Sequence, residues 1–487
     1  RTIDDFDETI DDFALASMAL SLKAISLNPS LLDEYGASDR LLFSAADYLD
    51  LSKSKTMTAL QGLLADEEIK TLLSMFLLAS AKKNLSMCSF RLFEVQKPKE
   101  EVVWSTKVTK EDLENAVEDE FGVKYSKDWK RLLWAPKYLC GEYSVREGVK
   151  VIGGLAFVYC KSLTNINIPN SVTTIGEGAF IGCESLTSIN IPNSVTTIGY
   201  SAFDGCRFLT SITIPSSVVT IIGNPFCRWH GNLYNESKAF IYEDHVLFNK
   251  NKTILIAYIA KEIDYTIPNS VTTIGVSAFA CCDSLISINI PNSVTTIGES
   301  AFSDCKSLTN INIPNSVTTI GESAFENCES LTSINIPNSV TTIGKCAFNY
   351  CESLISINIP NSVTTIGKGA FSCCVSLSSI NIPNSATTIE DWAFDGCASI
   401  ISINIPNSVT TIGEGAFSYC ESLTSINIPN NVNTIGKSAF FGCESLTNIN
   451  IPNSVTTIEA GAFRGCENLP SHIKSDIIQR FGEKVFE

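Results

Sequence analysis

The sequence has few of the side chains on which most catalytic and metal sites depend. Its 487 residues include only three histidines, four methionines and five tryptophans. His230, His245 and His472 do not stand at the spacing of a zinc site or of a nucleophile and its base. Glycine-rich phosphate loops, the HExxH zinc motif and the GxSxG nucleophile motif are absent from the sequence. We therefore expect no enzymatic activity, no cofactor and no metal site.

Positive charge is also scarce. Lys and Arg number 35 against 52 Asp and Glu, which gives a formal net charge of −17. A nucleic-acid partner needs a basic face that neutralises phosphates, so this balance argues against one. The longest apolar run, Leu72–Ala79, is interrupted by Ser74 and falls short of the roughly 18 residues of a membrane span. The sequence predicts neither a nucleic-acid-binding protein nor a membrane-spanning one.

What the sequence has in abundance is a 23-residue repeat. The unit Cys328–Tyr350 reads CESLTSINIPNSVTTIGKCAFNY, and the units on either side of it are nearly the same. A period of this length predicts a solenoid, in which each coil buries its apolar face against the next coil. The Ile-Pro pair marks the period, with prolines at Pro268, Pro291, Pro314, Pro337, Pro360, Pro383, Pro406, Pro429 and Pro452.

Each unit contains the pattern of a half-buried strand. Ile334 and Ile336 alternate with Asn335, which predicts a short strand with isoleucine inward and asparagine outward. Pro337 lacks a backbone N–H and ends the strand. A second short buried edge follows, and Gly344 then opens a tight corner.

The corner glycine is preferred and not obligatory. Its slot holds Ile222, Glu390 and Glu459 in three coils. A position that required positive φ would rarely accept isoleucine. We therefore expect another reason for the glycine.

Two buried slots hold the same residue in almost every coil. One of the two slots holds phenylalanine and the other holds cysteine. Because a slot shared by all coils is a packing position, we expect the cysteines to be free thiols in preference to disulfides. The vicinal pairs Cys281-Cys282 and Cys373-Cys374 lack ligands at zinc spacing, and we expect no metal or redox role for them. The phenylalanine slot holds Phe157, Phe180, Phe203, Phe226, Phe279, Phe302, Phe325, Phe348, Phe371, Phe394, Phe417, Phe440 and Phe463. The cysteine slot holds Cys160, Cys183, Cys206, Cys282, Cys305, Cys328, Cys351, Cys374, Cys397, Cys420, Cys443 and Cys466.

The pattern LxxIxIPxSVxxIGxxAFxxC resembles the BspA-type leucine-rich repeat, from about Val123 to Cys466. The resemblance implies a leucine-rich-repeat solenoid, a β-rich right-handed coil of short strands. Such repeats are common on bacterial or protist surface proteins that bind host proteins or other cells, which implies a secreted or cell-surface location. Free thiols, in contrast, favour a reducing compartment such as the cytoplasm, and this conflict stays open.

The sequence predicts three regions along the chain. Residues 1–118 are a helical region and a connector, 119–466 are the solenoid, and 467–487 are a helix that covers the last coil. The helical region is either a docking or targeting module or a cap on the first coil. We expect a first helix that stops at Asn28 and a short one that begins at a capping box of Ser30 and Asp33 and ends at Gly36. Further helices are expected at 39–51, capped by Ser38, at 56–64 and at 66–83. A last one begins at a capping box of Thr109 and Asp112 and runs to Glu118.

The period breaks once inside the solenoid. Pro215 and Pro268 stand 53 positions apart, which is one period plus 30. A polar turn at 249–252 lies between two apolar runs, so we expect a β-hairpin extension within a longer variant repeat at about 223–264. We expect this repeat to keep the register of the coils. Such insertions often bind ligands, and the candidate specificity residues are Trp229, His230, Tyr234, Tyr242 and His245.

A second candidate surface is the row of asparagines on the outward side of the first strand. The row can bind a protein or glycan, as the family resemblance implies, or it can merely solvate the strands. Adjacent threonines such as Thr341 and Thr342 form another row, of which at most one per pair faces outward, and an ice-binding array is a remote third possibility. The candidate interaction face is Asn289, Asn312, Asn335, Asn358, Asn381, Asn404, Asn427 and Asn450.

We therefore predict a non-enzymatic binding scaffold that mediates protein binding or cell-surface adhesion through the repeat face. The alternative is a purely structural or self-associating surface protein. The sequence leaves the oligomeric state open.

Overall fold

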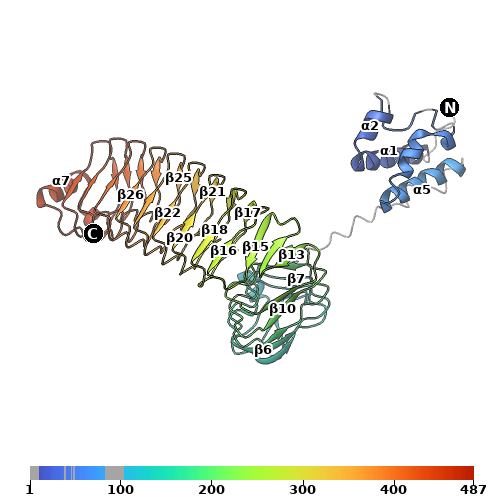
Figure 1. Cartoon of the computed structure of the whole chain (residues 1–487), viewed down its shortest axis with the longest axis horizontal. Coiled ribbons are helices and arrows are strands. Elements are labelled where there is room, and N and C mark those ends of the chain that lie inside the picture. Colours follow the sequence, from blue (N-terminus) through green and yellow to red (C-terminus); the bar gives the residue numbers. More distant parts are fainter. Residues whose placement is uncertain (1–9, 38–39, 45, 48–49, 83–103) are drawn as a thin grey trace. The chain divides into compact units, whose positions relative to one another are not determined.

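The computed structural model describes residues 10–37, 40–44, 46–47, 50–82 and 104–487 (Figure 1). The chain forms two compact units, Arg1–Val103 and Trp104–Glu487, and each is described by itself. The first unit is helical and the second is a solenoid of short strands.

The helical unit buries a small apolar core. Leu20, Leu60 and Phe76 are fully buried in it, and the ring of Phe43 stacks on that of Phe76 with centroids 4.8 Å apart. Its described elements are α1 (Ile10–Leu27), α2 (Ser30–Tyr35), the 3₁₀ turn η2 (Leu51–Lys53), α4 (Lys55–Gln61) and α5 (Glu67–Lys82).

Two details of the helical prediction are wrong. Helix α2 ends at Gly36 as expected, but its N-cap is Pro29 and the capping box of Ser30 does not form. The predicted helix at 39–51 is not formed at 40–44, because the Ser44 backbone N–H and hydroxyl both bond to the Asp47 carboxylate, 2.7 and 2.6 Å away. This reciprocal Ser-x-x-Asp pair is a capping box that starts a helix after Ser44, and residues 46 and 47 are helical as predicted. The proposed Ser38 cap lies outside the described residues.

Each coil of the solenoid contributes one strand to each of two separate rows, and within a row the strands of successive coils pair in parallel (Figure 1). In the Asn-side row, Ile334 pairs with Ile357 and Asn335 with Asn358, and in the Thr-side row Ile320 pairs with Ile343. Identical residues therefore lie above one another along the solenoid. The Asn-side strands are β4 (Cys140–Ser144), β6 (Ser162–Asn167), β8 (Ser188–Ile189), β10 (Ser211–Ile214), β12 (Asn232–Asn235), β16 (Asp264–Thr266), β18 (Ser287–Asn289), β20 (Asn310–Asn312), β22 (Ser333–Asn335), β24 (Ser356–Asn358), β26 (Ser379–Asn381), β28 (Ser402–Asn404), β30 (Ser425–Asn427) and β32 (Asn448–Asn450). The Thr-side strands are β3 (Arg131–Trp134), β5 (Val151–Ile152), β7 (Thr174–Ile175), β9 (Thr197–Ile198), β11 (Thr220–Ile221), β15 (Ile254–Tyr258), β17 (Thr273–Ile274), β19 (Thr296–Ile297), β21 (Thr319–Ile320), β23 (Thr342–Ile343), β25 (Thr365–Ile366), β27 (Thr388–Ile389), β29 (Thr411–Ile412), β31 (Thr434–Ile435) and β33 (Thr457–Ile458).

The phenylalanine ladder forms as predicted. The ring of Phe348 lies parallel to those of Phe325 and Phe371, with centroids 5.3 and 5.4 Å apart, and all three rings are fully buried. The cysteine slot packs beside it: the Sγ of Cys328 donates to the carbonyl of Phe302 in the preceding coil, 3.2 Å away. The cysteines of this slot are free thiols.

The corner glycine is favoured by close approach and not by its φ angle. An ideal Cβ on Gly344 would lie 2.5 Å from the backbone of Gly321 in the preceding coil. Positive φ occurs instead two residues and six residues later, at Cys346 (52°) and Tyr350 (56°). The corner thus has two left-handed positions that the sequence analysis did not identify.

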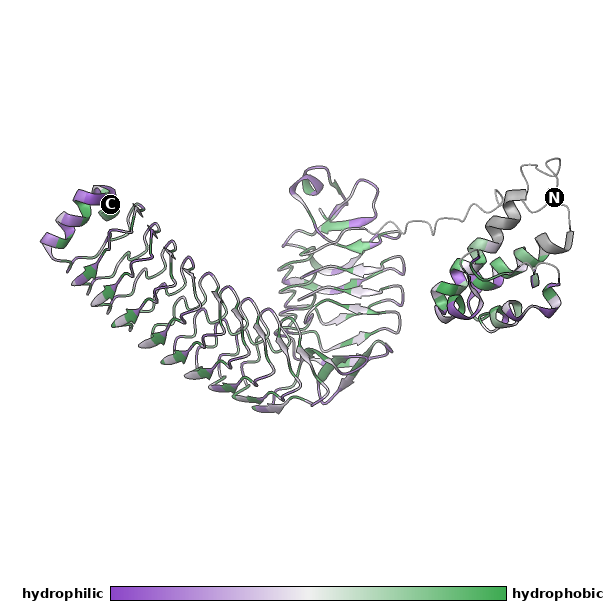
Figure 2. Cartoon of the chain, turned by 90° about the horizontal axis from the view of Figure 1, so that it is seen from above, coloured by the Kyte–Doolittle hydropathy of each residue, from purple (hydrophilic) through white to green (hydrophobic). Residues whose placement is uncertain are grey.

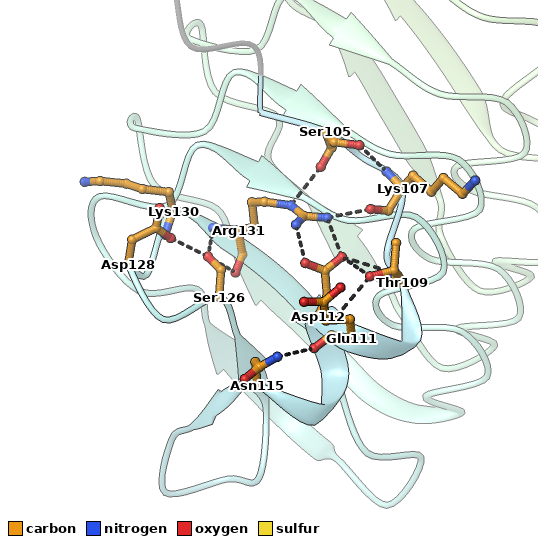
Figure 3. Close-up of polar contacts among 10 residues, drawn as sticks. All are labelled: Ser105, Lys107, Thr109, Glu111, Asp112, Asn115, Ser126, Asp128, Lys130 and Arg131. Atoms are coloured by element: carbon orange, nitrogen blue, oxygen red, sulfur yellow. Dashed lines mark hydrogen bonds and ion pairs between the residues drawn. The ribbon is translucent and has the colours of Figure 1, made fainter.

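The first coil is tied to a segment that precedes it. The Arg131 guanidinium binds the Asp112 carboxylate at 2.8 Å, and its Nε donates to the Ser105 carbonyl, also 2.8 Å away (Figure 3). The capping box of Thr109 and Asp112 forms, but helix α6 (Lys110–Glu114) is shorter than predicted and the strand β1 (Val117–Glu118) follows it. The solenoid unit therefore begins at Trp104 and not at residue 119. Strand β2 (Lys124–Tyr125) joins β1 and β3 in an antiparallel meander.

The long repeat interrupts both strand rows. On the Thr side, β13 (Phe240–Glu243), β14 (Val246–Asn249) and β15 form a second antiparallel meander, and β15 then pairs in parallel with β17. The predicted turn at 249–252 links β14 to β15, and a second tight turn at 244–245 links β13 to β14. Strand β11 pairs only with β9, so the expected continuous register is wrong. The solenoid bends at this junction (Figure 2).

The C-terminal segment packs on the last coil. Helix α7 (Ser471–Phe481) buries Ile477, and the 3₁₀ turn η5 (Glu483–Phe486) places the ring of Phe486 5.8 Å from that of Phe463, the last in the ladder. The Phe463 N–H donates to the carbonyl of Val485 at 2.8 Å, as it would to a further coil. Ile478, which the pattern placed on the same buried face, is 36% exposed.

Candidate binding surfaces

The eight candidate asparagines form a continuous exposed row. Each occupies the last position of a strand from β18 to β32, with its neighbouring isoleucine turned toward the core. Asn312 lies opposite Asn335 in register, and Asn427 opposite Asn450. None of the eight side chains makes a hydrogen bond to another described residue. The row therefore offers free amide donors and acceptors at the strand spacing of about 4.8 Å.

The threonine row differs because most of its outward hydroxyls are already bonded, although those of Thr341 and Thr387 make no hydrogen bond to a described residue. The Oγ1 of Thr318 donates to the carbonyl of Thr295 in the preceding coil at 3.5 Å, and that of Thr364 donates to Thr341 at 3.4 Å. Thr341 is exposed and Thr342 is half-buried, but both threonines are exposed in the pairs 318–319 and 364–365, so the expectation that at most one per pair faces outward is wrong for those coils. Because most of these hydroxyl protons form hydrogen bonds within the solenoid, the threonine row is a weaker candidate for ordering water.

The residues of the predicted specificity loop do not lie together as one surface. Trp229 is 2% exposed, and its Nε1 donates to the Leu209 carbonyl at 2.7 Å. It stands 23 residues after Cys206 and fills the cysteine slot of its coil, so it is a core residue and not part of an exposed loop. Tyr234, in contrast, is 57% exposed on β12.

Tyr242 and His245 lie together at the tip of the first hairpin. The Tyr242 hydroxyl and the His245 Nδ1 are 3.2 Å apart, and burial raises the pKa of Tyr242. Asp244 and His245 both have positive φ, as a two-residue hairpin turn of this kind requires. His230 lies elsewhere, beside Lys261, and burial together with the charge of Lys261 lowers its pKa.

A cavity of about 220 Å³ lies at the junction where the solenoid bends. Its walls come from three segments that the period break brings together: 226–230, 258–261 and 280–284. Of the predicted residues only Trp229 and His230 line it; the analysis of the sequence did not identify Arg228, Tyr258 or Cys281. The length of the insertion predicts that the repeat is interrupted here, but it does not predict which side chains line the cavity.

In the part of the chain that the structure describes, no group of three or more His, Cys, Asp or Glu side chains is placed to hold a metal ion. Among the same residues, no helix combines the length and the apolar character of a membrane span.

Comparison with known proteins identifies the family. The model of the BspA-type leucine-rich repeat region matches six copies, at residues 141–235, 261–374 and 341–470, which together cover more than half of the chain. The chain belongs to the BspA-type leucine-rich repeat family. The family resemblance and the solenoid fold predicted from the sequence are thereby confirmed. A search of curated proteins finds no match.

Several solved bacterial structures are similar to this BspA-type chain. A leucine-rich repeat protein from Eubacterium ventriosum ATCC 27560 is 31% identical, with 57% of this chain and 82% of that chain covered and a TM-score of 0.49. One from Bacteroides ovatus ATCC 8483 is 30% identical, covering 76% and 96%, with a TM-score of 0.41. A leucine rich cell surface protein from Faecalibacterium prausnitzii A2-165 is 31% identical, covering 69% and 94%, with a TM-score of 0.41.

Proposed function

We propose that this protein is a non-enzymatic binding scaffold of a cell surface, which engages a protein or glycan partner through the asparagine row. The observation that carries the proposal is the difference between the two polar rows of the solenoid. The asparagine amides are exposed and make no hydrogen bond to other described residues, whereas most of the outward threonine hydroxyls, such as those of Thr318 and Thr364, bond to the preceding coil. Exposed polar groups without an intramolecular partner are available to a ligand.

The form of the row favours an extended partner. The same amide recurs in every coil from Asn289 to Asn450, so no single coil provides a distinctive pocket. A long or repetitive ligand gains affinity by contacting many equivalent positions at once. Proteins with leucine-rich repeats typically mediate protein interactions, which places a protein partner before a glycan.

A purely structural or self-associating surface protein is the second candidate. The row repeats one chemistry, and amide rows of two copies can pair with each other as well as with a ligand. An ice-binding array ranks third because most of the outward threonine hydroxyls are already bonded within the solenoid.

A pair of matched triple variants tests the proposal. One replaces Asn312, Asn335 and Asn358 with lysine, and the other places lysine at the exposed Thr318, Thr341 and Thr364, which lie on the other strand row. Both variants add the same charge in the same coils. The full chain and both variants are applied to a glycan array and to a panel of extracellular-matrix and cell-surface proteins.

We expect a bound partner to be lost in the asparagine variant and retained in the threonine variant. Thermal unfolding of each variant checks that the solenoid persists. A partner that both variants bind equally well contradicts the role of the row. No binding on either panel, together with concentration-dependent association in light scattering, favours the self-associating alternative.

A further inference from the structure

Successive coils are joined at their corners by a repeated backbone hydrogen bond. In each coil, the N–H of the second left-handed residue donates to a carbonyl of the next coil. Gly205 bonds in this way to Cys227 at 3.0 Å, and Cys281 to Ser303 at 2.8 Å. The same bond, which we call the corner rung, occurs in the coils from Tyr159 to Gly442 with one exception.

The exception is Arg228, at the junction. Arg228 has the left-handed conformation of its slot, with φ of 53°, but its N–H makes no hydrogen bond to a described residue. The carbonyl that the repeat assigns to it, that of Ala280, receives only the Sγ of Cys282 at 4.0 Å. One corner rung is therefore missing, and a donor and an acceptor are left without their usual partners.

The rung is missing because an inserted segment holds the two corners apart. Asn224 still bonds to the other corner, because its N–H donates to the Val276 carbonyl at 3.1 Å. The N–H of Tyr258 then takes the Ala278 carbonyl at 2.8 Å, which Phe226 would otherwise bind. The Phe226 N–H turns back to the Asn224 side chain at 2.8 Å. The corners are thus joined at Asn224 and separated beyond it.

The 220 Å³ cavity lies in this separation. Arg228, Tyr258 and Ala280 all line it, and Trp229 and Ile259 add apolar walls. Tyr258 is 4% exposed, and its hydroxyl has no hydrogen-bond partner. Burial raises the pKa of this hydroxyl. A buried hydroxyl without a partner costs free energy, which a bound polar group would recover.

We propose that this cavity binds one residue of an extended polypeptide, whose backbone replaces the missing corner rung. The carbonyl that precedes that residue accepts from the Arg228 N–H, and the residue's own N–H, which points the opposite way across the same trans peptide group, donates to the Ala280 carbonyl. Its side chain lies against Trp229 and Ile259, where the Tyr258 hydroxyl meets a polar atom. This is backbone-directed peptide recognition at an opened hydrogen-bond ladder. The site is separate from the asparagine row and does not depend on the function proposed for it.

Blocked single amino acids provide the probe. N-acetyltyrosine N-methylamide carries the required N–H and C=O together with a side-chain hydroxyl for Tyr258, and its analogue methylated on the tyrosine nitrogen lacks the backbone donor. We expect the first to bind the full chain and the second to bind about tenfold more weakly, as the loss of one backbone hydrogen bond implies. Hydrogen exchange at Arg228, fast compared with that at Gly205 and Cys281 in the free protein, should slow when the amide binds.

Three variants separate the site from the fold. Ala280→Leu fills the cavity and should abolish binding, whereas Ser303→Leu makes a similar change at the equivalent position of the next coil, where the rung is intact. Tyr258→Phe removes a hydroxyl that is unbonded in the free protein, so it should leave the thermal midpoint unchanged or raised while weakening the amide.

Equal binding of the two probes, no binding of the amide at millimolar concentration, or slow exchange of the Arg228 N–H in the free protein would overturn the proposal. Loss of binding in Ala280→Leu but not in Ser303→Leu, with weaker binding in Tyr258→Phe, supports it.

Discussion

The phenylalanine ladder makes the sharpest prediction about stability, at Phe348. Its ring is fully buried between two parallel rings, at 5.3 and 5.4 Å. The backbone bonds on both sides, from Phe325 to Ala347 and from Phe348 to Ala370, are each 2.8 Å long and hold the coils at fixed spacing. The coils cannot close over a missing ring, so the cavity left by Phe348→Ala remains. We expect a loss of about 3–5 kcal/mol of unfolding free energy.

A second substitution separates stacking from burial. Phe348→Leu keeps most of the apolar burial but removes two ring pairs, each worth about 0.5–1.5 kcal/mol, so we expect a loss of about 1–3 kcal/mol. Phe208 provides the control, because it is 67% exposed. Phe208→Ala should change the unfolding free energy by less than about 0.5 kcal/mol.

The assay has to detect local stability. Solenoid stability is close to a sum of neighbouring interfaces, and long repeat arrays depart from two-state unfolding. Hydrogen exchange of the coils around Phe348, alongside a urea titration, reports the change where it occurs. If Phe348→Ala were no more destabilising than Phe208→Ala, the ladder would not be a principal source of stability, and the reasoning would fail.

Two other features give predictions. Gly344→Ala puts a Cβ against the backbone of the preceding coil, so we expect a urea titration to show a loss of about 1–3 kcal/mol of unfolding free energy. Glu390→Ala, in the same slot of another coil, should lose much less. Equal losses would refute the close-approach explanation. Burial raises the pKa of Cys160 to about 11, while Cys140 is exposed. At pH 8 a thiol reagent followed by peptide mapping should therefore label Cys140 in the native protein and Cys160 only after unfolding. Rapid labelling of Cys160 in the native protein would show that this slot is not closed.

The period predicted the regular coils well because the same residues surround each slot in every coil. Phe348 and Cys328 could be assigned to the core on this ground alone, without knowledge of the tertiary structure. The 23-residue spacing also assigns two further residues to slots of the coils, which the prediction did not do. Trp229 stands 23 residues after Cys206 and is buried, and Phe486 stands 23 after Phe463 and is half-buried at the end of the ladder.

The left-handed corner positions also left a trace in the sequence. Gly415 stands 23 residues after Trp392, and Gly442 stands 23 after Tyr419. In the structure each glycine lies under the aromatic ring of the preceding coil, where a Cβ would collide with it. An aromatic residue followed by glycine one period later is therefore a signal for an exposed ring lying across the next corner.

The sequence by itself determined the solenoid, its buried ladders and the exposed asparagine row, because nearest-neighbour contacts between identical coils settle these features. Only the tertiary structure decided the junction. Tyr258 takes the Ala278 carbonyl that Phe226 would otherwise bind, and the corner rung from Arg228 to Ala280 does not form. That exchange depends on the path of the inserted segment, which has no repeat to predict it. The regular coils follow from the period, and the cavity follows from the place where the period stops.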